Sequence, residues 1–325
     1  MKTLHMAVCV LVGVSMLNLA GGAGAQQGYP SRPIRFIVPF APGAGTDFVA
    51  RLVGRKLTER LGQQVIVENR TGASGTIGTD LVAKSAPDGY TLLLGFLGPL
   101  ALNPNLEKVP YSPQRDFAGV SLLASAYSVL VVHPSLPVKT VKDLIGLAKA
   151  RPGELNYASS GTGTNVYLVS ELFKMRTGID MAHIPYKGTA PAAIALLSGE
   201  AQVLFGSVIG VLPHVRTNRL RALAVLSPKR SRLLSSVPTL VEAGVGGVDV
   251  AFWYALVVPA ATPSEIVARL HADIVAIATT PDYQTQLERQ GLELITSRPE
   301  QFSAFLQSEL DKWGKVIKAA GIRAD

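Results

Sequence analysis

The chain has 325 residues, of which 48% are hydrophobic and 17% are charged, so it is long enough for one large or two ordinary domains with substantial cores. This composition excludes a disordered tail protein. The 31 glycines and 21 prolines follow no fixed period, which excludes collagen-like and low-complexity chains. The formal net charge of +8 favours anionic partners without identifying one.

Residues 1–25 have the pattern of a secretory signal peptide. Lys2 precedes an apolar run, Met6 to Ala20, and Ala23-Gly24-Ala25 forms a small-residue cleavage site. The run is shorter than the roughly 20 residues that a membrane span needs, so we expect cleavage after Ala25 rather than a retained anchor. The only cysteine, Cys9, lies in this segment. The mature chain is therefore expected to be a periplasmic protein stabilised by its core, without disulfides.

Short runs rich in valine and isoleucine alternate with segments of helical periodicity, which is typical of an α/β architecture with parallel sheets. The predicted strands are Ile34 to Phe40, Gln64 to Glu68, Thr91 to Gly95, Ser128 to Val132, Leu155 to Ala158, Met181 to Pro185 and Gln202 to Phe205. The predicted helices are Phe48 to Leu61, Asn165 to Arg176 and Ala190 to Ser198, closed by Gly62, Gly178 and Gly199.

Three further patterns predict helix starts. Thr140 with Asp143 resembles an N-cap with an acid in the first turn. The segments Thr262-Pro263-Ser264-Glu265 and Ser297-Arg298-Pro299-Glu300 each have the form of a capping box, with proline inside the first turn. They predict the last long helices of the chain.

Two long extended stretches, Tyr127 to His133 and Val248 to Pro259, divide the chain into an outer pair of segments and an inner one. We interpret them as interdomain crossings. The chain is then expected to form a discontinuous first domain from residues 26–127 and 249–325, and a second domain from residues 128–248. Two domains joined by two crossings form a hinged arrangement with a cleft between the lobes.

One pattern occurs twice, once in each predicted domain. Ala41-Pro42-Gly43-Ala44-Gly45-Thr46-Asp47 and Ser159-Ser160-Gly161-Thr162-Gly163-Thr164 both follow a strand and run into a helix. Glycines let the backbone approach a ligand closely, and the free N–H groups of a helix start attract an anion. A glycine turn can also be purely structural, but two of them at strand ends facing one cleft favour a carboxylate site.

Several kinds of chemistry are excluded. The third glycine of a dinucleotide fingerprint is replaced by Phe48 and Val166, and there is no phosphate loop. The sequence has no catalytic motif, and its histidines are too dispersed for a metal site. The basic cluster Lys229 to Arg232 lacks interleaved aromatic residues and is interpreted as a solvated loop, not a nucleic-acid surface. We therefore expect neither cofactor nor metal, and no enzyme.

Other side chains near the expected cleft have two interpretations each. Asp47 either contacts the ligand or caps its helix. Tyr186 and Lys187 either reach the cleft or form a turn after a strand, and Trp253 with Tyr254 either packs the hinge or forms an aromatic wall of the site.

The sequence also resembles a known family. The segments that carry the resemblance are Pro39 to Asp47, Val67-Glu68-Asn69-Arg70, Pro87 to Leu92, Leu102 to Leu106, Pro185-Tyr186-Lys187-Gly188 and Val237-Pro238-Thr239-Leu240. In this order they look like the Bug-type (TctC-like) solute-binding receptors of tripartite tricarboxylate transporters, over nearly all of the mature chain.

The resemblance implies a type II periplasmic binding protein fold, with a ligand held between two α/β lobes. It implies a monomeric receptor that captures a small organic carboxylate through main-chain groups and water, and delivers it to the large and small membrane subunits of the transporter. A receptor that signals to a membrane sensor kinase remains the alternative. The residues expected to contact the ligand are Phe40, Pro42, Gly43, Ala44, Gly45, Thr46, Asp47, Phe96, Leu97, Ser160, Gly161, Thr162, Gly163, Thr164, Tyr167, Tyr186, Lys187, Gly206 and Trp253.

Two positions depart from the family pattern. Tyr167 stands where the second loop usually has a histidine, and the stretch at the inner strand that usually bears an aspartate appears here as Gln202 and Gly206. Because an aspartate would suit an ammonium group, its absence disfavours an amino acid and leaves room for a plain or aromatic carboxylate.

Overall fold

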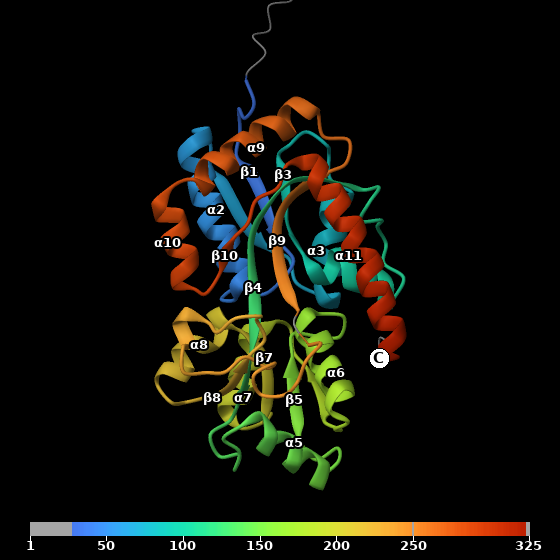
Figure 1. Cartoon of the computed structure of the whole chain (residues 1–325). Helices are drawn as coiled ribbons and strands as arrows, with labels where there is room; N and C mark the ends of the chain where they lie inside the picture. Colours follow the sequence, from blue (N-terminus) through green and yellow to red (C-terminus); the bar gives the residue numbers. More distant parts are fainter. Residues whose placement is uncertain (1–27, 249, 323–325) are drawn as a thin grey trace, which may run out of the picture. The chain divides into compact units, whose positions relative to one another are not determined.

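The computed structural model describes residues 28–248 and 250–322, so the expected signal peptide and its cleavage site lie outside the described residues. The chain divides after Ser31, and a second, compact unit begins at Arg32. The second unit carries all the helices and strands described below (Figure 1). Within the described ranges, no helix combines the length and the apolar character that crossing a membrane requires.

The first part of the sheet combines parallel and antiparallel strands. Strands β1 (Ile34–Val38), β2 (Val65–Asn69) and β3 (Thr91–Phe96) are parallel, whereas β9 (Ala251–Pro259) runs antiparallel to β3 and to β4 (Phe117–Val132). The short strand β10 (Glu293–Leu294) pairs with β4. We call this part, with Phe117–Tyr127 of β4, the first lobe. Its helices are α2 (Gly45–Leu61), α3 (Thr76–Ala83), α4 (Asn103–Leu106), α9 (Ser264–Ala278), α10 (Pro281–Arg289) and α11 (Pro299–Ala320), with helical turns at Ala73–Gly75 and Gly98–Leu102.

The second part of the sheet is built on the last five residues of β4, Ser128–Val132. They pair antiparallel with β7 (Val203–Ser207) and β8 (Arg221–Val225), and β7 continues in parallel to β5 (Asn156–Ser159) and β6 (Ala182–Pro185). We call this part the second lobe. Its helices are α5 (Val141–Ala150), α6 (Asn165–Thr177), α7 (Thr189–Ser198) and α8 (Val208–Arg216), with a helical turn at Arg232–Leu234.

Strand β4 connects the two lobes and is far longer than the predicted strand Ser128 to Val132. Its partner changes from β9, at Tyr127, to β7, at Ser128. The prediction of purely parallel sheets was wrong for the strands at the crossing, because β4 and β9 run in opposite directions between the lobes. The parallel prediction holds for β1, β2 and β3 and for β5, β6 and β7.

Local sequence signals account for most helix ends. Gly62, Gly178 and Gly199 adopt the left-handed conformation after α2, α6 and α7. Thr140 and Asp143 form a complete capping box at the start of α5. These predictions are confirmed. They could be made from the sequence because the hydrogen bonds involved join residues that are close in the chain.

The two predicted C-terminal capping boxes were wrong, although the helices exist. Helix α9 begins at Ser264 without a side-chain cap, and Thr262 Oγ1 donates to Pro259 O instead (2.7 Å). Before α11, Ser297 Oγ accepts from Leu122 N (3.0 Å), while Arg298 N donates to Gln301 Oε1 (2.9 Å). The hydroxyls of Thr262 and Ser297 therefore form hydrogen bonds outside the helices instead of capping them.

Candidate functional site

Four helices begin at one small cavity between the lobes. Its volume is about 30 Å³, and the helices are α2 of the first lobe and α6, α7 and α8 of the second. The first N–H groups of a helix have no intrahelical acceptor and carry a partial positive charge. The cavity therefore suits an anion. Its lining residues are Phe40, Ala41, Ala44, Gly45, Thr46, Phe96, Ser160, Asn165, Val166, Thr189, Ser207, Phe252 and Tyr254.

The buried carboxylate of Asp47 stabilises the first glycine loop. Its carboxylate accepts hydrogen bonds from Gly43 N (3.2 Å), Arg51 Nε (3.0 Å) and Asn69 Nδ2 (3.1 Å). Burial disfavours the charged form, but the bonds from Arg51, Asn69 and Gly43 outweigh it and hold the pKa of Asp47 below its usual value. Asp47 is thus buried and fully partnered, and it does not line the cavity.

Hydroxyl groups hold the second glycine loop. Ser159 Oγ accepts from Gly161 N (3.0 Å) and is hydrogen-bonded to His183 Nε2 (2.6 Å). Thr164 Oγ1 donates to Gly161 O (2.7 Å) and accepts from Tyr167 N (3.4 Å), which caps α6. The Tyr167 ring packs on His183, with centroids 4.8 Å apart. These side chains shape the loop and leave the backbone of α6 to face the cavity.

The second loop also contacts the first lobe. Ser74 Oγ donates to Thr162 O. The amide of Asn103, which is fully buried, donates to Ser74 O (3.2 Å) and Thr76 Oγ1 (3.1 Å). Its Oδ1 has no hydrogen-bond partner within the described part of the chain and lies 2.5 Å from where a Cβ on Gly163 would stand. The two lobes therefore meet closely at Gly163.

Four aromatic rings of the first lobe line the cavity. Phe96 lies 5.5 Å from Phe40, 5.3 Å from Tyr254 and 6.4 Å from Phe252, measured between ring centroids. The Tyr254 hydroxyl stands against Gly45, where any Cβ would overlap it. Burial raises the pKa of Tyr254, so its hydroxyl stays protonated at neutral pH.

The structure brings part of the predicted site together. The residues of that set that line the cavity are Phe40, Ala44, Gly45, Thr46, Phe96 and Ser160. Trp253 does not, because successive residues of a strand face opposite ways: its Nε1 donates to Glu309 Oε2 (3.0 Å), while Tyr254 faces the cavity. Gly206 does not line the cavity either. A Cβ built on it would lie 2.6 Å from Val211 Cγ1.

The other predicted residues lie around the cavity rather than on its surface. Pro42, Gly43 and Lys187 are exposed, and Leu97 is buried. The Tyr186 hydroxyl is buried without a hydrogen-bond partner among the described residues. The remaining ones, Asp47, Gly161, Thr162, Gly163, Thr164 and Tyr167, hold the two loops as described above.

The predicted site lacked the starts of α7 and α8, although a helix from Ala190 to Ser198 was expected. Thr189 and Ser207 line the cavity, as do Asn165 and Val166, which directly follow the second pattern. Ser207 caps α8 by accepting from Gly210 N (3.4 Å). Their positions in the sequence could have revealed Thr189 and Ser207 as site residues. Each lies where a parallel strand ends and a helix begins, although the turn has no second glycine.

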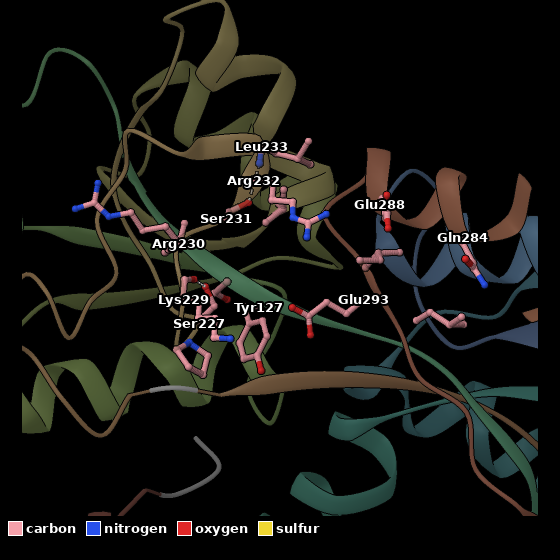
Figure 2. A pocket seen from close by; sticks show the side chains of 17 residues that line it. Tyr127, Ser227, Lys229, Arg230, Ser231, Arg232, Leu233, Gln284, Glu288 and Glu293 are labelled. Carbon is pink, nitrogen blue, oxygen red and sulfur yellow. Dashed lines mark hydrogen bonds between the residues drawn. The ribbon is translucent and has the colours of Figure 1, made fainter. Parts of the chain in front are cut away.

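A larger cavity of about 690 Å³ lies beside the crossing strand β4, at Tyr127 and Ser128 (Figure 2). The segment from Ser227 to Leu233 supplies basic residues to its lining, while α10 and β10 supply Glu288 and Glu293. Three basic side chains, Lys229, Arg230 and Arg232, face two carboxylates across this cavity, so the charges of its lining largely offset one another. The basic cluster predicted as a solvated loop forms this lining, and its Arg230 pairs with Glu242 (2.8 Å).

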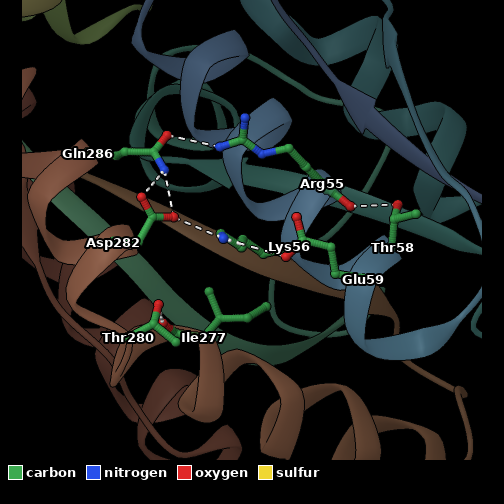
Figure 3. Close-up of polar contacts among 9 residues, drawn as sticks. Arg55, Lys56, Thr58, Glu59, Ile277, Thr280, Asp282 and Gln286 are labelled. Atoms are coloured by element: carbon green, nitrogen blue, oxygen red, sulfur yellow. Dashed lines mark hydrogen bonds and ion pairs between the residues drawn. The ribbon is translucent and has the colours of Figure 1, made fainter.

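The acidic side of this cavity is attached to the first lobe. Lys56 on α2 pairs with Asp282 on α10 (2.9 Å), and Arg55 Nη2 donates to Gln286 Oε1 (2.9 Å; Figure 3). Helix α10 therefore belongs to the first lobe in packing. No group of three or more potential metal-ligating side chains was found in the described parts of the chain.

The fold and the cavity between its halves define the class of the protein, a type II periplasmic binding protein. R. palustris Rpa4515, solved with adipate, is 37% identical and superposes with a TM-score of 0.88, covering 91% of this chain and 99% of that one. MatC (Rpa3494) from Rhodopseudomonas palustris, solved with bound malate, is 32% identical and superposes with a TM-score of 0.84. The match covers 89% of this chain and 100% of that one.

Sequence comparison gives the family. Residues 49–322 match the model of the tripartite tricarboxylate transporter family receptor. Protein BugT of Bordetella pertussis is 39% identical over 325 residues, covering 99% of both chains. The chain belongs to the tripartite tricarboxylate transporter receptor family, as its motifs predicted.

Proposed function

We propose that this chain is a periplasmic solute-binding protein that captures a small organic carboxylate between its lobes. It would deliver this ligand to the large and small membrane subunits of a tripartite tricarboxylate-type transporter. The observation that carries the proposal is the convergence of four helix starts on one cavity without a charged side chain among its lining residues.

The chemistry of this cavity matches a carboxylate. Each helix start contributes roughly 0.3–1 kcal/mol to binding an exposed anion and up to about 2 kcal/mol when partly buried. The hydroxyls of Ser160, Thr189 and Ser207 add donors, and bridging water satisfies the remaining oxygen lone pairs. Related receptors solved with adipate and malate support this ligand class.

The lobes must separate for the ligand to reach this site. A volume of about 30 Å³ accommodates roughly one or two water molecules, far less than an organic acid. We propose that residues 26–127 with 249–325 rotate against residues 128–248 about the crossing strands β4 and β9. Two strands between rigid lobes form a suitable hinge.

We propose no catalytic step. Ser159 and His183 resemble a nucleophile and base, since they are 2.6 Å apart. However, Ser159 is fully buried, does not line the cavity and already accepts from Gly161 N. The pair therefore acts on the loop, not on a substrate.

Isothermal titration calorimetry tests the proposal. Protein is unfolded, dialysed and refolded to remove bound molecules, and then titrated with mono-, di- and tricarboxylates. We expect a one-to-one complex with at least one acid, and thermal stabilisation of roughly 2.7 kcal/mol at a hundredfold excess over Kd. Absence of heat and of thermal shift across the panel would refute carboxylate binding.

Delivery and localisation need separate measurements. Cells that express the cognate membrane subunits should take up the labelled ligand only when this protein is present. N-terminal sequencing of the periplasmic form should begin at Gln26 if cleavage follows Ala25. Uptake independent of the protein would support a sensory role instead.

A further inference from the structure

The two walls of the ligand cavity differ in chemistry. The second lobe contributes Ser160, Asn165, Val166, Thr189 and Ser207, together with three of the four helix starts. Apart from one valine, the side chains of this wall are hydroxyls and an amide, and the helix starts add backbone N–H groups without intrahelical acceptors. It is therefore the wall that suits a carboxylate.

The first lobe presents the opposite character. Its wall includes Phe40, Phe96, Phe252 and Tyr254, each at most 7% exposed. The rings pack in tilted and edge-on pairs around Phe96, so they form a continuous aromatic surface. Such a surface binds a flat apolar group through area burial and through ring–ring contacts worth about 0.5–1.5 kcal/mol each.

From this asymmetry, and resting on the proposed function, we infer that the ligand is an aromatic monocarboxylate. Its carboxylate lies at the helix starts of the second lobe, and its ring lies against the aromatic wall of the first lobe. Closure of the lobes then removes both ends of the molecule from water. The wall residues Phe40, Phe96 and Phe252 determine the specificity.

A second carboxylate would meet no basic side chain on the first-lobe wall, where the start of α2 is the one group among the lining residues that suits an anion. The lining residues of the cavity include no lysine, arginine or histidine. A dicarboxylate would place its second charge against Phe96 and Phe252, where loss of hydration is uncompensated. The first lobe contributes one helix start, that of α2 at Gly45 and Thr46. It adjoins the same cavity, so its N–H groups add to the binding of the single carboxylate.

The test compares acids of similar size. Refolded protein is titrated with benzoate, with cyclohexanecarboxylate as a non-aromatic ring of similar shape, and with adipate and malate. We expect benzoate to bind at least tenfold more tightly than either dicarboxylate, with cyclohexanecarboxylate in between. Tighter binding of adipate or malate would overturn this inference and leave the proposed function intact, whereas no binding by any acid would overturn both.

A variant pair locates the specificity on the wall. Phe96→Leu removes the central ring and should weaken benzoate binding by tenfold or more, while changing the affinity for cyclohexanecarboxylate by less than threefold. Phe305→Leu is the matched control, because Phe305 packs on Trp253 away from the cavity (5.4 Å between centroids). If Phe96→Leu does not fold, Phe40→Leu replaces it. Equal losses for both acids would contradict ring-specific recognition.

Discussion

The two glycine loops share a sequence pattern but belong to walls of opposite chemistry. After the first loop, the cavity is completed by β3 and β9, which contribute Phe96, Phe252 and Tyr254. After the second, it is completed by the starts of α7 and α8, at Thr189 and Ser207. The contrast shows that a loop motif determines the backbone shape, whereas the neighbouring strands and helix starts determine which groups line the cavity.

The loops also differ in how they are held. The first uses a buried carboxylate, Asp47, paired with Arg51. The second uses neutral hydroxyls, Ser159 and Thr164. In both, these side chains are engaged by the protein itself, so we expect backbone N–H groups, with hydroxyls such as that of Ser160, to recognise the anion. The following predictions test this comparison, beginning with the largest effect.

Gly45→Val should abolish ligand binding, by more than a hundredfold, because any Cβ at Gly45 overlaps the Tyr254 hydroxyl. Calorimetry measures the loss, and circular dichroism shows whether the fold remains. Gly146→Val is the matched control, since nothing lies within 4 Å of a Cβ at Gly146. Normal affinity in a folded Gly45→Val protein would contradict close backbone contact.

Gly163→Ala should lower affinity about tenfold. Gly163 has a φ of +79°, and its Cβ would stand 2.5 Å from Asn103 Oδ1, so both strain and overlap oppose the close approach of the lobes. In an Asn103→Ala background the overlap is absent, and the same substitution should cost clearly less. Equal costs in both backgrounds would place the whole effect in backbone strain.

Asp47→Asn should weaken ligand binding three- to tenfold and reduce the free energy of unfolding by about 1–2 kcal/mol, because a buried charge-assisted contact to Arg51 is lost. Ser159→Ala should cost less, since its bonds involve no formal charge. Urea unfolding and calorimetry measure both. A larger loss for Ser159→Ala would reverse the comparison between the loops.

Glu68 should make stability depend on acid pH. Hydrogen bonds from Arg35, opposed by burial and aided by Arg70, lower the pKa of Glu68 to about 2 from the usual 4.5. A lowered native pKa means that this stabilisation is present above pH 4.5 and is lost as the pH falls through about 2. Glu68→Gln should reduce stability at pH 7 by about 1 kcal/mol, after allowance for partial exposure, and flatten this acid dependence. An unchanged slope between pH 5 and about 2 in the variant would contradict the assignment.

Lys187→Met should have the smallest effect, less than about 1 kcal/mol on binding, because Lys187 is exposed and does not line the ligand cavity. Arg232→Met, at the larger cavity, should be equally mild. A loss above about 3 kcal/mol for Lys187→Met would indicate a charge-paired ligand instead. Calorimetry at two salt concentrations distinguishes the outcomes.

The sequence alone was sufficient for features that depend on neighbouring residues. The glycine ends of α2, α6 and α7 and the N-cap of α5 at Thr140 were predicted correctly, because a short turn and its hydrogen bonds are encoded in a few consecutive positions. The sequence also predicted the α/β fold class and, through its motifs, the family. Both glycine loops were found, with six of the lining residues.

Tertiary structure decided the rest. The hydroxyls of Thr262 and Ser297 bond to distant or non-helical partners, Tyr254 rather than Trp253 faces the cavity, and β4 extends from Phe117 through both lobes. The third and fourth helix starts and the aromatic wall come from segments far apart in the sequence, since Phe40 and Tyr254 line the same cavity. Hydrogen-bond partners, strand orientation and convergence in space depend on long-range packing, and no local pattern of residues contains that information.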